Sequence, residues 1–158
     1  MKKTTNRKSY FFNLPSVLLM TLFTGIVCFT SCHKDVKRDK GVIIEELGDV
    51  CPNMTSSGEY VITSSTELSA ALAGSGCTSS SFNVDFTKNT LIGKRVTGKC
   101  KFKKIFNQVK RDDSAKRIQF SILLRSKGNC ESEFSQWSWV VVPNFPSDYA
   151  VFFAVEER

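Results

Sequence analysis

The residues that could carry chemistry in this chain are its six cysteines, which are accompanied by a single histidine, His33. No two cysteines have the Cys-x-x-Cys spacing that is typical of zinc and redox sites. A Ser-His-Asp or Cys-His catalytic arrangement needs an imidazole inside the folded domain. His33 stands immediately after Cys32 and ahead of the first predicted strand of the domain. We therefore expect no metal site, no cofactor and no histidine-dependent hydrolysis.

The segment that precedes Cys32 has the features of an export signal. An apolar run over 14–29 follows a basic leader that contains Lys2, Lys3, Arg7 and Lys8. This run is too short and interrupted to span a bilayer, which takes about 20 apolar residues. Small residues at Thr30 and Ser31 then precede Cys32, as in the lipobox of signal peptidase II substrates, although Phe29 replaces the usual Leu. We expect residues 1–31 to be removed and the sulfur of Cys32 to carry diacylglycerol.

Lipidation at Cys32 would anchor the mature protein to a membrane through a polar tether over 32–41. We expect this membrane to be the outer membrane of a bacterial cell envelope. The residues after the anchor, 33–40, lack the acidic cluster that resembles surface-export signals in Bacteroidetes. This absence favours an anchor that faces the periplasm.

Four cysteines remain in the mature domain, and an oxidising envelope compartment predicts two disulfides from them. Three pairings are possible, and we expect Cys51–Cys77 and Cys100–Cys130. The first bridge would close one local unit of a strand and a helix. The second would join the open ends of a hairpin whose turn is centred near Asp113.

A pair of carboxylates could hydrolyse glycosidic bonds without histidine. Asp85, Glu131 and Glu133 are the candidates, but the sequence brings no two of them into one cleft, and Asp85 is more typical of a turn-supporting residue. Gly74-Ser75-Gly76 lacks the lysine of a phosphate-binding loop. The favoured function is therefore a non-enzymatic protein-interaction module. A carboxylate-dependent envelope enzyme, such as a glycan hydrolase, is the alternative.

Charge is distributed unevenly along the chain. Residues 41–87 contain six acidic residues and no Lys or Arg, whereas 94–127 contain twelve Lys and Arg against two Asp. The basic segment could attract lipopolysaccharide or acidic glycans, while nucleic acid is not expected as a partner in an envelope compartment. The simpler interpretation is that acidic and basic strands lie side by side in one sheet and neutralise each other.

About 117 residues follow the tether, which is enough for a single domain over 42–158. Alternating apolar residues predict strands over 41–47, 59–63, 82–86, 91–97, 100–109, 118–124, 136–142 and 149–156. The alternation changes parity at Lys103-Lys104, which predicts a β-bulge. Ser64 to Glu67 begins a short helix. We expect a mainly β (α+β) fold, an antiparallel sandwich or curled sheet of about eight strands, in which the last two strands pair with each other.

Aromatic residues near the C-terminus predict one core strand and one candidate contact. Trp137 and Trp139 alternate with Val140 and Val142, so bulky apolar groups occupy both faces of this strand. We expect the strand to be central and both indoles to belong to the core. Phe145 lies between two prolines in a loop and is a candidate partner contact.

One serine is a candidate for modification. Asp113-Ser114-Ala115 resembles the three-residue O-glycosylation sequon of Bacteroidetes, and Ser114 falls at the predicted tip of a hairpin. An ordinary polar turn is the alternative interpretation.

Residues 58–155 also resemble a known family. The resemblance lies in Val61-Ile62-Thr63, the helix start at 65–67, the run Val84 to Gly93, and Val140 to Pro143. These segments are similar to the C-terminal domain of the protease-complex subunit PrcB family and to small cysteine-containing lipoproteins of Bacteroidetes. Between 98 and 104 the chain departs from the PrcB pattern, since Cys100 and lysines replace a glycine-rich turn. The resemblance implies a protein-interaction role near a protease, with an envelope protein or protease as partner and no catalytic residue carried over.

Overall fold

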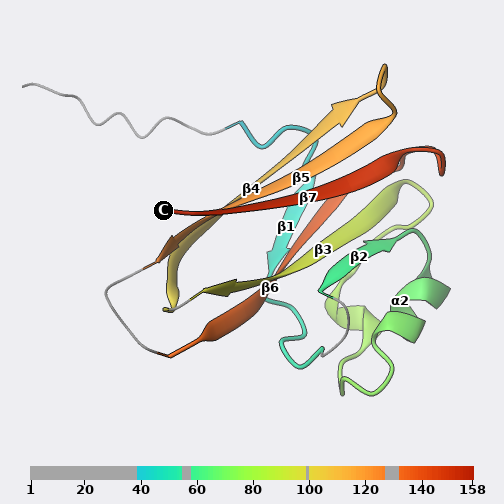
Figure 1. Ribbon diagram of the computed structural model, residues 1–158. Helices are drawn as coiled ribbons and strands as arrows, with labels where there is room; N and C mark the ends of the chain where they lie inside the picture. Colours follow the sequence, from blue (N-terminus) through green and yellow to red (C-terminus); the bar gives the residue numbers. More distant parts are fainter. Residues whose placement is uncertain (1–38, 55–57, 99, 127–131) are drawn as a thin grey trace, which may run out of the picture. The chain divides into compact units, whose positions relative to one another are not determined.

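Seven strands in two sheets make up most of the described chain (Figure 1). The computed structural model describes residues 39–54, 58–98, 100–126 and 132–158. The elements are β1 (Glu45–Gly48), β2 (Glu59–Ile62), α2 (Ser65–Ala71), the 3-10 turn η1 (Ser79–Ser81), β3 (Asn89–Gly98), β4 (Phe102–Asp112), β5 (Arg117–Ser126), β6 (Phe134–Pro143) and β7 (Ala150–Glu157). They confirm a mainly β sandwich with one short helix among the described residues, within a compact unit that begins at Asp39. The predicted signal segment and Cys32 lie outside the described residues.

The order of the strands differs from the expected order at the C-terminus. A four-stranded sheet has the order β1-β6-β3-β2, and a three-stranded sheet has the order β4-β5-β7. The prediction that the last two strands pair with each other is wrong, because β6 lies between β1 and β3 while β7 runs parallel to β5. The loop over 144–149 carries the chain from one sheet to the other. Alternation reveals which face of a strand is buried, but it does not identify the neighbouring strand.

The segment 82–86 is not a strand, so the described chain has one strand fewer than expected. Phe82 follows η1 and is fully buried, with its ring edge-on to Trp139 at 5.2 Å. Asn83 has a φ of 42°, in the left-handed region, which an extended strand does not use. The carboxylate of Asp85 accepts hydrogen bonds from the backbone N–H and hydroxyl of Thr87. The alternation of apolar and polar residues over 82–86 therefore reflects burial of the apolar side chains against the core, in a segment that pairs with no strand in the described chain.

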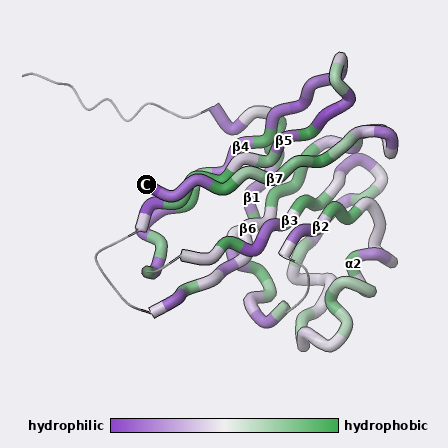
Figure 2. Tube along the Cα trace, viewed as in Figure 1, coloured by the Kyte–Doolittle hydropathy of each residue, from purple (hydrophilic) through white to green (hydrophobic). Residues whose placement is uncertain are grey.

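Strand β6 separates two hydrophobic cores, as the sequence predicted. Trp137 and Trp139 are fully buried on one of its faces, and Val140 and Val142 are buried on the other face. The second core lies between the two sheets and draws on β3, β5 and β6. Figure 2 shows hydrophobic stretches along β3, β5 and β7, whereas the hairpin end of β4 and β5 is hydrophilic. The predicted bulge is confirmed, since the β4–β5 register shifts between Phe102 and Lys104.

The outer face of the four-stranded sheet is covered by a layer that we call the cap, made of the loop over 48–54, α2 and η1. Helix α2 begins as predicted, because the Ser64 hydroxyl accepts the N–H of Glu67 at 3.2 Å. The Glu67 carboxylate in turn accepts the N–H of Thr63 at 2.7 Å, and these bonds hold its pKa below the usual value. A helix of seven residues is too short to be stable alone, so the burial of Leu68 and Leu72 must hold it.

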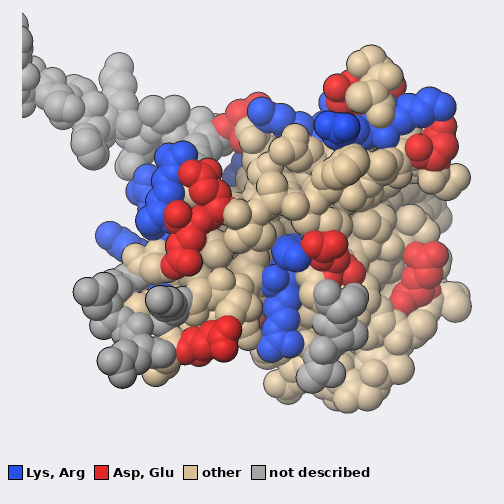
Figure 3. Space-filling view, in the orientation of Figure 1, with Lys and Arg blue, Asp and Glu red and all other residues tan. Residues whose placement is uncertain are grey.

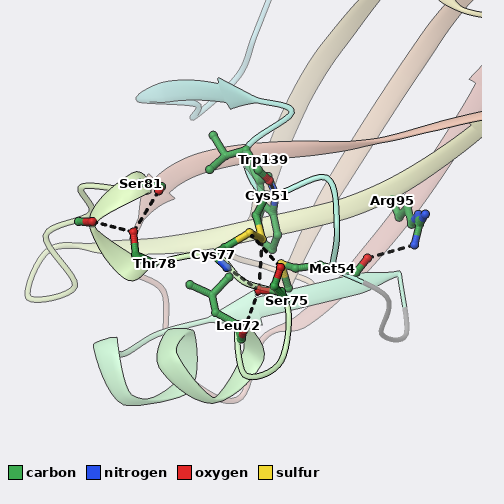
Figure 4. The surroundings of a disulfide bond; sticks show 11 residues. Cys51, Met54, Leu72, Ser75, Cys77, Thr78, Ser81, Arg95 and Trp139 are labelled. Carbon is green, nitrogen blue, oxygen red and sulfur yellow. Dashed lines mark hydrogen bonds between the residues drawn. A yellow bond between two sulfur atoms is a disulfide. The ribbon is translucent and has the colours of Figure 1, made fainter.

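The predicted disulfide between Cys51 and Cys77 is confirmed, with a Cα–Cα distance of 5.8 Å. Figure 4 shows this bond beside Leu72, Ser75 and Trp139. The indole N–H of Trp139 donates to the carbonyl of Val50 at 3.0 Å, which fixes the disulfide loop to β6. Cys100 is buried and disulfide-bonded. Its expected partner, Cys130, lies outside the described residues, so that pairing stays a prediction.

Candidate functional site

The two sheets leave an open cleft of about 570 Å³ where the edges of β2 and β7 approach each other. Its lining consists of Val61, Thr63, Thr90, Asn144, Phe145, Ser147, Tyr149 and Val151. These residues come from β2, the start of β3, the loop over 144–149 and the start of β7. We call this feature the edge cleft. It is a candidate binding site because concave, partly apolar surfaces with a few polar groups are typical of such sites.

The cleft is open because β2 and β7 are both edge strands. Each of them pairs with a single strand in the described chain, β2 with β3 and β7 with β5. Val61 faces the space between the sheets beside Ile92, yet 38% of its surface is exposed while Ile92 is fully buried. Val155 is 44% exposed although its partner in β5, Ile122, is buried. The inter-sheet core therefore reaches solvent along this side of the sandwich.

Asn144 holds one end of the loop that lines the cleft. Its backbone N–H donates to the carbonyl of Lys88 at 2.9 Å, and its side-chain oxygen accepts the Thr90 hydroxyl at 2.9 Å. Its side-chain amide also donates to the carbonyl of Phe86 at 3.3 Å. Thr90 is buried, so this partner satisfies a hydroxyl that would otherwise cost free energy to bury.

Tyr149 holds the other end of the loop through the β4–β5 hairpin. Its hydroxyl donates to the Asp113 carboxylate at 2.6 Å, and Arg111 donates to the same oxygen at 2.6 Å. The Arg111 guanidinium also lies over the Tyr149 ring, 5.2 Å from its centre. Lys116 and Asp148 form an ion pair at 2.6 Å beside them. The wall of the cleft is thus positioned before any ligand arrives.

The hydrogen bonds around Tyr149 favour an ionised Asp113 and a protonated Tyr149 hydroxyl. The hydroxyl of Tyr149 and the guanidinium of Arg111 lower the pKa of Asp113. The Asp113 carboxylate, as an acceptor, raises the pKa of Tyr149. Asp113 is therefore a bonded anion that orients the loop, and it is not available as an acid in the cleft.

Phe145 is half-buried and belongs to the wall of the cleft. Its ring lies 6.3 Å from the Tyr149 ring, and it packs against the inter-sheet core. The loop does not present Phe145 as a protruding side chain. Its role as a partner contact stays a prediction. If Phe145 contacts a partner, it does so as part of the cleft wall.

Sequence reasoning did not single out the other contributors to the cleft. Val61, Thr90 and Asn144 are ordinary strand and loop residues whose positions depend on long-range pairing. Tyr149 was assigned to the last strand, and nothing in the local sequence indicates its bond to Asp113. The one available signal was Phe145 between two prolines.

The lining of the cleft contains hydroxyls and one amide but no Asp, Glu, His or Cys. Of the candidate carboxylates, Asp85 caps a turn, and its bonds to Thr87 lower its pKa. Glu133 precedes Phe134, which pairs with Gly98, whereas Asp85 precedes Asn89 at the opposite end of β3. The length of that strand pair separates Asp85 and Glu133 by roughly 30 Å, far beyond glycosidase spacing. Glu131 lies outside the described residues.

Ser114 occupies the exposed tip of the β4–β5 hairpin, as the sequence predicted. Its hydroxyl donates to Asp112 at 2.6 Å, and the N–H of Ala115 donates to the same carboxylate oxygen. These bonds lower the pKa of Asp112. The hydroxyl thus supports a polar turn, and its glycosylation stays a prediction.

The prediction that acidic and basic strands lie side by side in one sheet and neutralise each other is confirmed only in part, at β2 and β3, because most of the basic residues lie on β4 and β5 in the other sheet. The basic strands β4 and β5 pair with each other, while the acidic strands β1 and β2 belong to the four-stranded sheet. One cross-strand ion pair joins β2 to β3 in the described chain, Glu59–Lys94 at 2.6 Å. Figure 3 shows Lys and Arg along the β4–β5 side of the molecule with Asp and Glu among them, and a further group of Lys and Arg near the middle of this face.

Among the residues that the structure describes, no group of three His, Cys, Asp or Glu could hold a metal ion. No described helix is long and apolar enough to cross a membrane.

No family model matches this chain, and neither the curated proteins nor the solved structures yielded a match.

Proposed function

We propose that this chain is a membrane-anchored lipoprotein that binds another envelope protein without catalysing a reaction. Cys32, after its lipobox-like residues, would supply the anchor, and the periplasmic side of the outer membrane is the proposed location. The PrcB-like residues over 58–155 support a partner that is a protease or works beside one. Protein binding, rather than hydrolysis, is also supported by a cleft whose lining has no carboxylate.

The edge cleft is the proposed binding site, and this one observation carries the proposal. Its walls are apolar at Val61 and Val151, and hydroxyl-bearing residues contribute to the rest of its lining. The adjoining strand β7 has an outer edge with no strand paired to it in the described chain. An extended segment of a partner could pair with such an edge and place alternate side chains in the cleft. We therefore propose an extended, partly apolar partner segment.

Photo-crosslinking in cells tests the proposal. A crosslinking residue at Val61 should yield an adduct with one envelope protein. The same residue at Ile44, which is 59% exposed beside β1 at the far edge of the same sheet, should not. Equal adducts from both positions, or none from Val61, would reject the cleft as the binding site.

The anchor needs a separate test. Replacement of Cys32 by Ala should move the protein out of the membrane fraction, and the intact mass of the wild type should include the acyl groups. A wild-type protein that keeps its leader and carries no acyl mass would reject the lipoprotein proposal.

A further inference from the structure

The outer face of the β4–β5 pair gathers cations on one surface. Ile105, Asn107 and Val109 point toward the core, so the alternate residues of β4 point outward. We call this outer surface the basic face, and its cations are Lys104, Lys110, Arg117 and Arg125. All four are exposed, and none of them belongs to an ion pair among the described residues.

Two of these cations stand directly opposite each other. Lys104 and Arg125 are register partners, and like charges in this position destabilise a sheet. Both lie over the ring of Phe106, at 4.5 and 5.5 Å from its centre. The ring attracts both cations but carries no net charge to balance them. A bound anion would remove the repulsion, which makes this pair the strongest anion-binding feature of the face.

Acidic groups limit the basic face on two sides. Asp112 lies opposite Arg117 near the hairpin, where its carboxylate is engaged with Ser114 and Ala115. Glu156 lies beside Leu123 on β7 and is paired with Arg158 at 2.6 Å. The cationic area is therefore the β4–β5 strip itself.

The chain enters the domain alongside this strip. The N–H of Val109 donates to the carbonyl of Lys40 at 3.1 Å, and Gln108 donates to the carbonyl of Asp39 at 2.8 Å. Seven residue steps separate Cys32 from Asp39, so a lipid on Cys32 would lie within about 25 Å of the start of the domain. Lipidation at Cys32, which belongs to the proposed function, would thus hold β4 near the membrane.

We propose that the basic face binds the phosphate groups of anionic lipids in the membrane that anchors the chain. The two acyl chains of the diacylglycerol on Cys32 would anchor the chain stably, and the basic face would hold the domain itself against the same membrane surface. The edge strand β7 and its cleft, on the other side of β5, would remain available to the protein partner.

Vesicle sedimentation tests this proposal with the unlipidated chain 33–158, which contains every described element. It should bind phosphatidylcholine vesicles that contain 30% phosphatidylglycerol and lose that binding in 0.5 M NaCl. The double variant Lys104→Gln/Arg125→Gln should bind roughly thirtyfold more weakly, because each lost cation should weaken binding about fivefold. The charge-matched control Lys88→Gln/Lys94→Gln should bind like wild type, and far-UV circular dichroism should confirm that all variants fold.

Equal binding to vesicles without the anionic lipid, or equal weakening in both double variants, would overturn the proposal. Binding to soluble acidic polysaccharide but not to vesicles would also overturn it and assign a different partner. The variant Val61→Glu should bind vesicles as wild type does. The vesicle experiment therefore tests lipid binding by the basic face separately from the proposals that the cleft binds a protein and that Cys32 is lipidated.

Discussion

The two faces of the four-stranded sheet are covered to different extents. On one face, the cap closes the core with Trp137 and Trp139 fully buried and a disulfide across its loops. On the other face, the three-stranded sheet covers the core but leaves Val61 and Val155 partly exposed at its edge. The closed face rigidifies the sheet, and the open face offers a preformed surface. Under the proposed function, stability and recognition would be assigned to opposite faces of the same strands.

Removal of the disulfide should have the largest effect on the closed face. The bond joins residues 26 apart, and a loop of this size contributes about 3 kcal/mol in the chain-entropy model. We expect Cys51→Ser/Cys77→Ser to lower the free energy of unfolding by this amount, as measured with urea. Non-reducing peptide mapping should also recover Cys51–Cys77 and Cys100–Cys130 from the wild type. A Cys51–Cys100 peptide would contradict the assignment.

Gly93 should be the next most sensitive position. A Cβ atom there would lie 2.0 Å from the ring of Trp139, which is its partner on β6. Because overpacking of a dense core is costly, Gly93→Ala should destabilise the domain by about 2 kcal/mol or more. Gly74→Ala is the control, since it meets no atom within 4 Å and suffers only from its φ of 78°. An equal loss of stability in both variants would show that contact with Trp139 is unimportant.

Three features of the fold could be predicted from the sequence because they depend on residues that are close together in the chain. The Ser64 cap, the bulge beside Lys104 and the two-faced burial of β6 each depend on neighbouring residues, and all three are confirmed. The Cys51–Cys77 bond followed from an even cysteine count and closeness along the chain. Local patterns carried this information because caps, bulges and alternation are short-range features.

The edge cleft could not be predicted because it is made by segments that are distant in sequence. Its formation depends on β7 joining β5 in parallel and on β2 ending a different sheet. A strand shows the same alternation of apolar residues in either sheet. The hydrophobic pattern therefore did not indicate that β6 and β7 belong to different sheets. The placement of the basic strands β4 and β5 in a different sheet from β1 and β2 was missed for the same reason.

A charge placed in the cleft should affect binding with little effect on stability. We expect Val61→Glu to reduce the adduct formed by a crosslinker at Val155 at least tenfold, because a carboxylate would face the apolar wall. Ile44→Glu, at the far edge of the sheet, should leave that adduct unchanged. Thermal unfolding of both variants should remain close to wild type. Equal loss of the adduct in both variants would reject the cleft.

The smallest effect should come from the pH dependence of the loop that forms the cleft wall. The pKa of Asp113 is lowered by Tyr149 and Arg111, so this contribution to stability is present above about pH 4 and is lost as the pH falls through the lowered value. The pKa of Tyr149 is raised, so its contribution is present below about pH 10 and is lost as the pH rises through the raised value.

The melting temperature of wild type and Tyr149→Phe should therefore differ by a small, constant amount between pH 5 and pH 9. The difference should shrink below pH 4 and above pH 10. A difference that does not change with pH across this range would show that the Tyr149–Asp113 bond does not orient the loop in solution.

Hydrogen exchange tests the central claim, that the open edge receives the partner, most directly. The mature protein would be compared alone and when crosslinked to its partner through Val61. We expect the β7 amides that point away from β5 to exchange readily in the free protein and to become protected in the complex, while those of β1 do not change. Protection confined to β1, or unchanged exchange at these β7 amides, would contradict binding at the open edge.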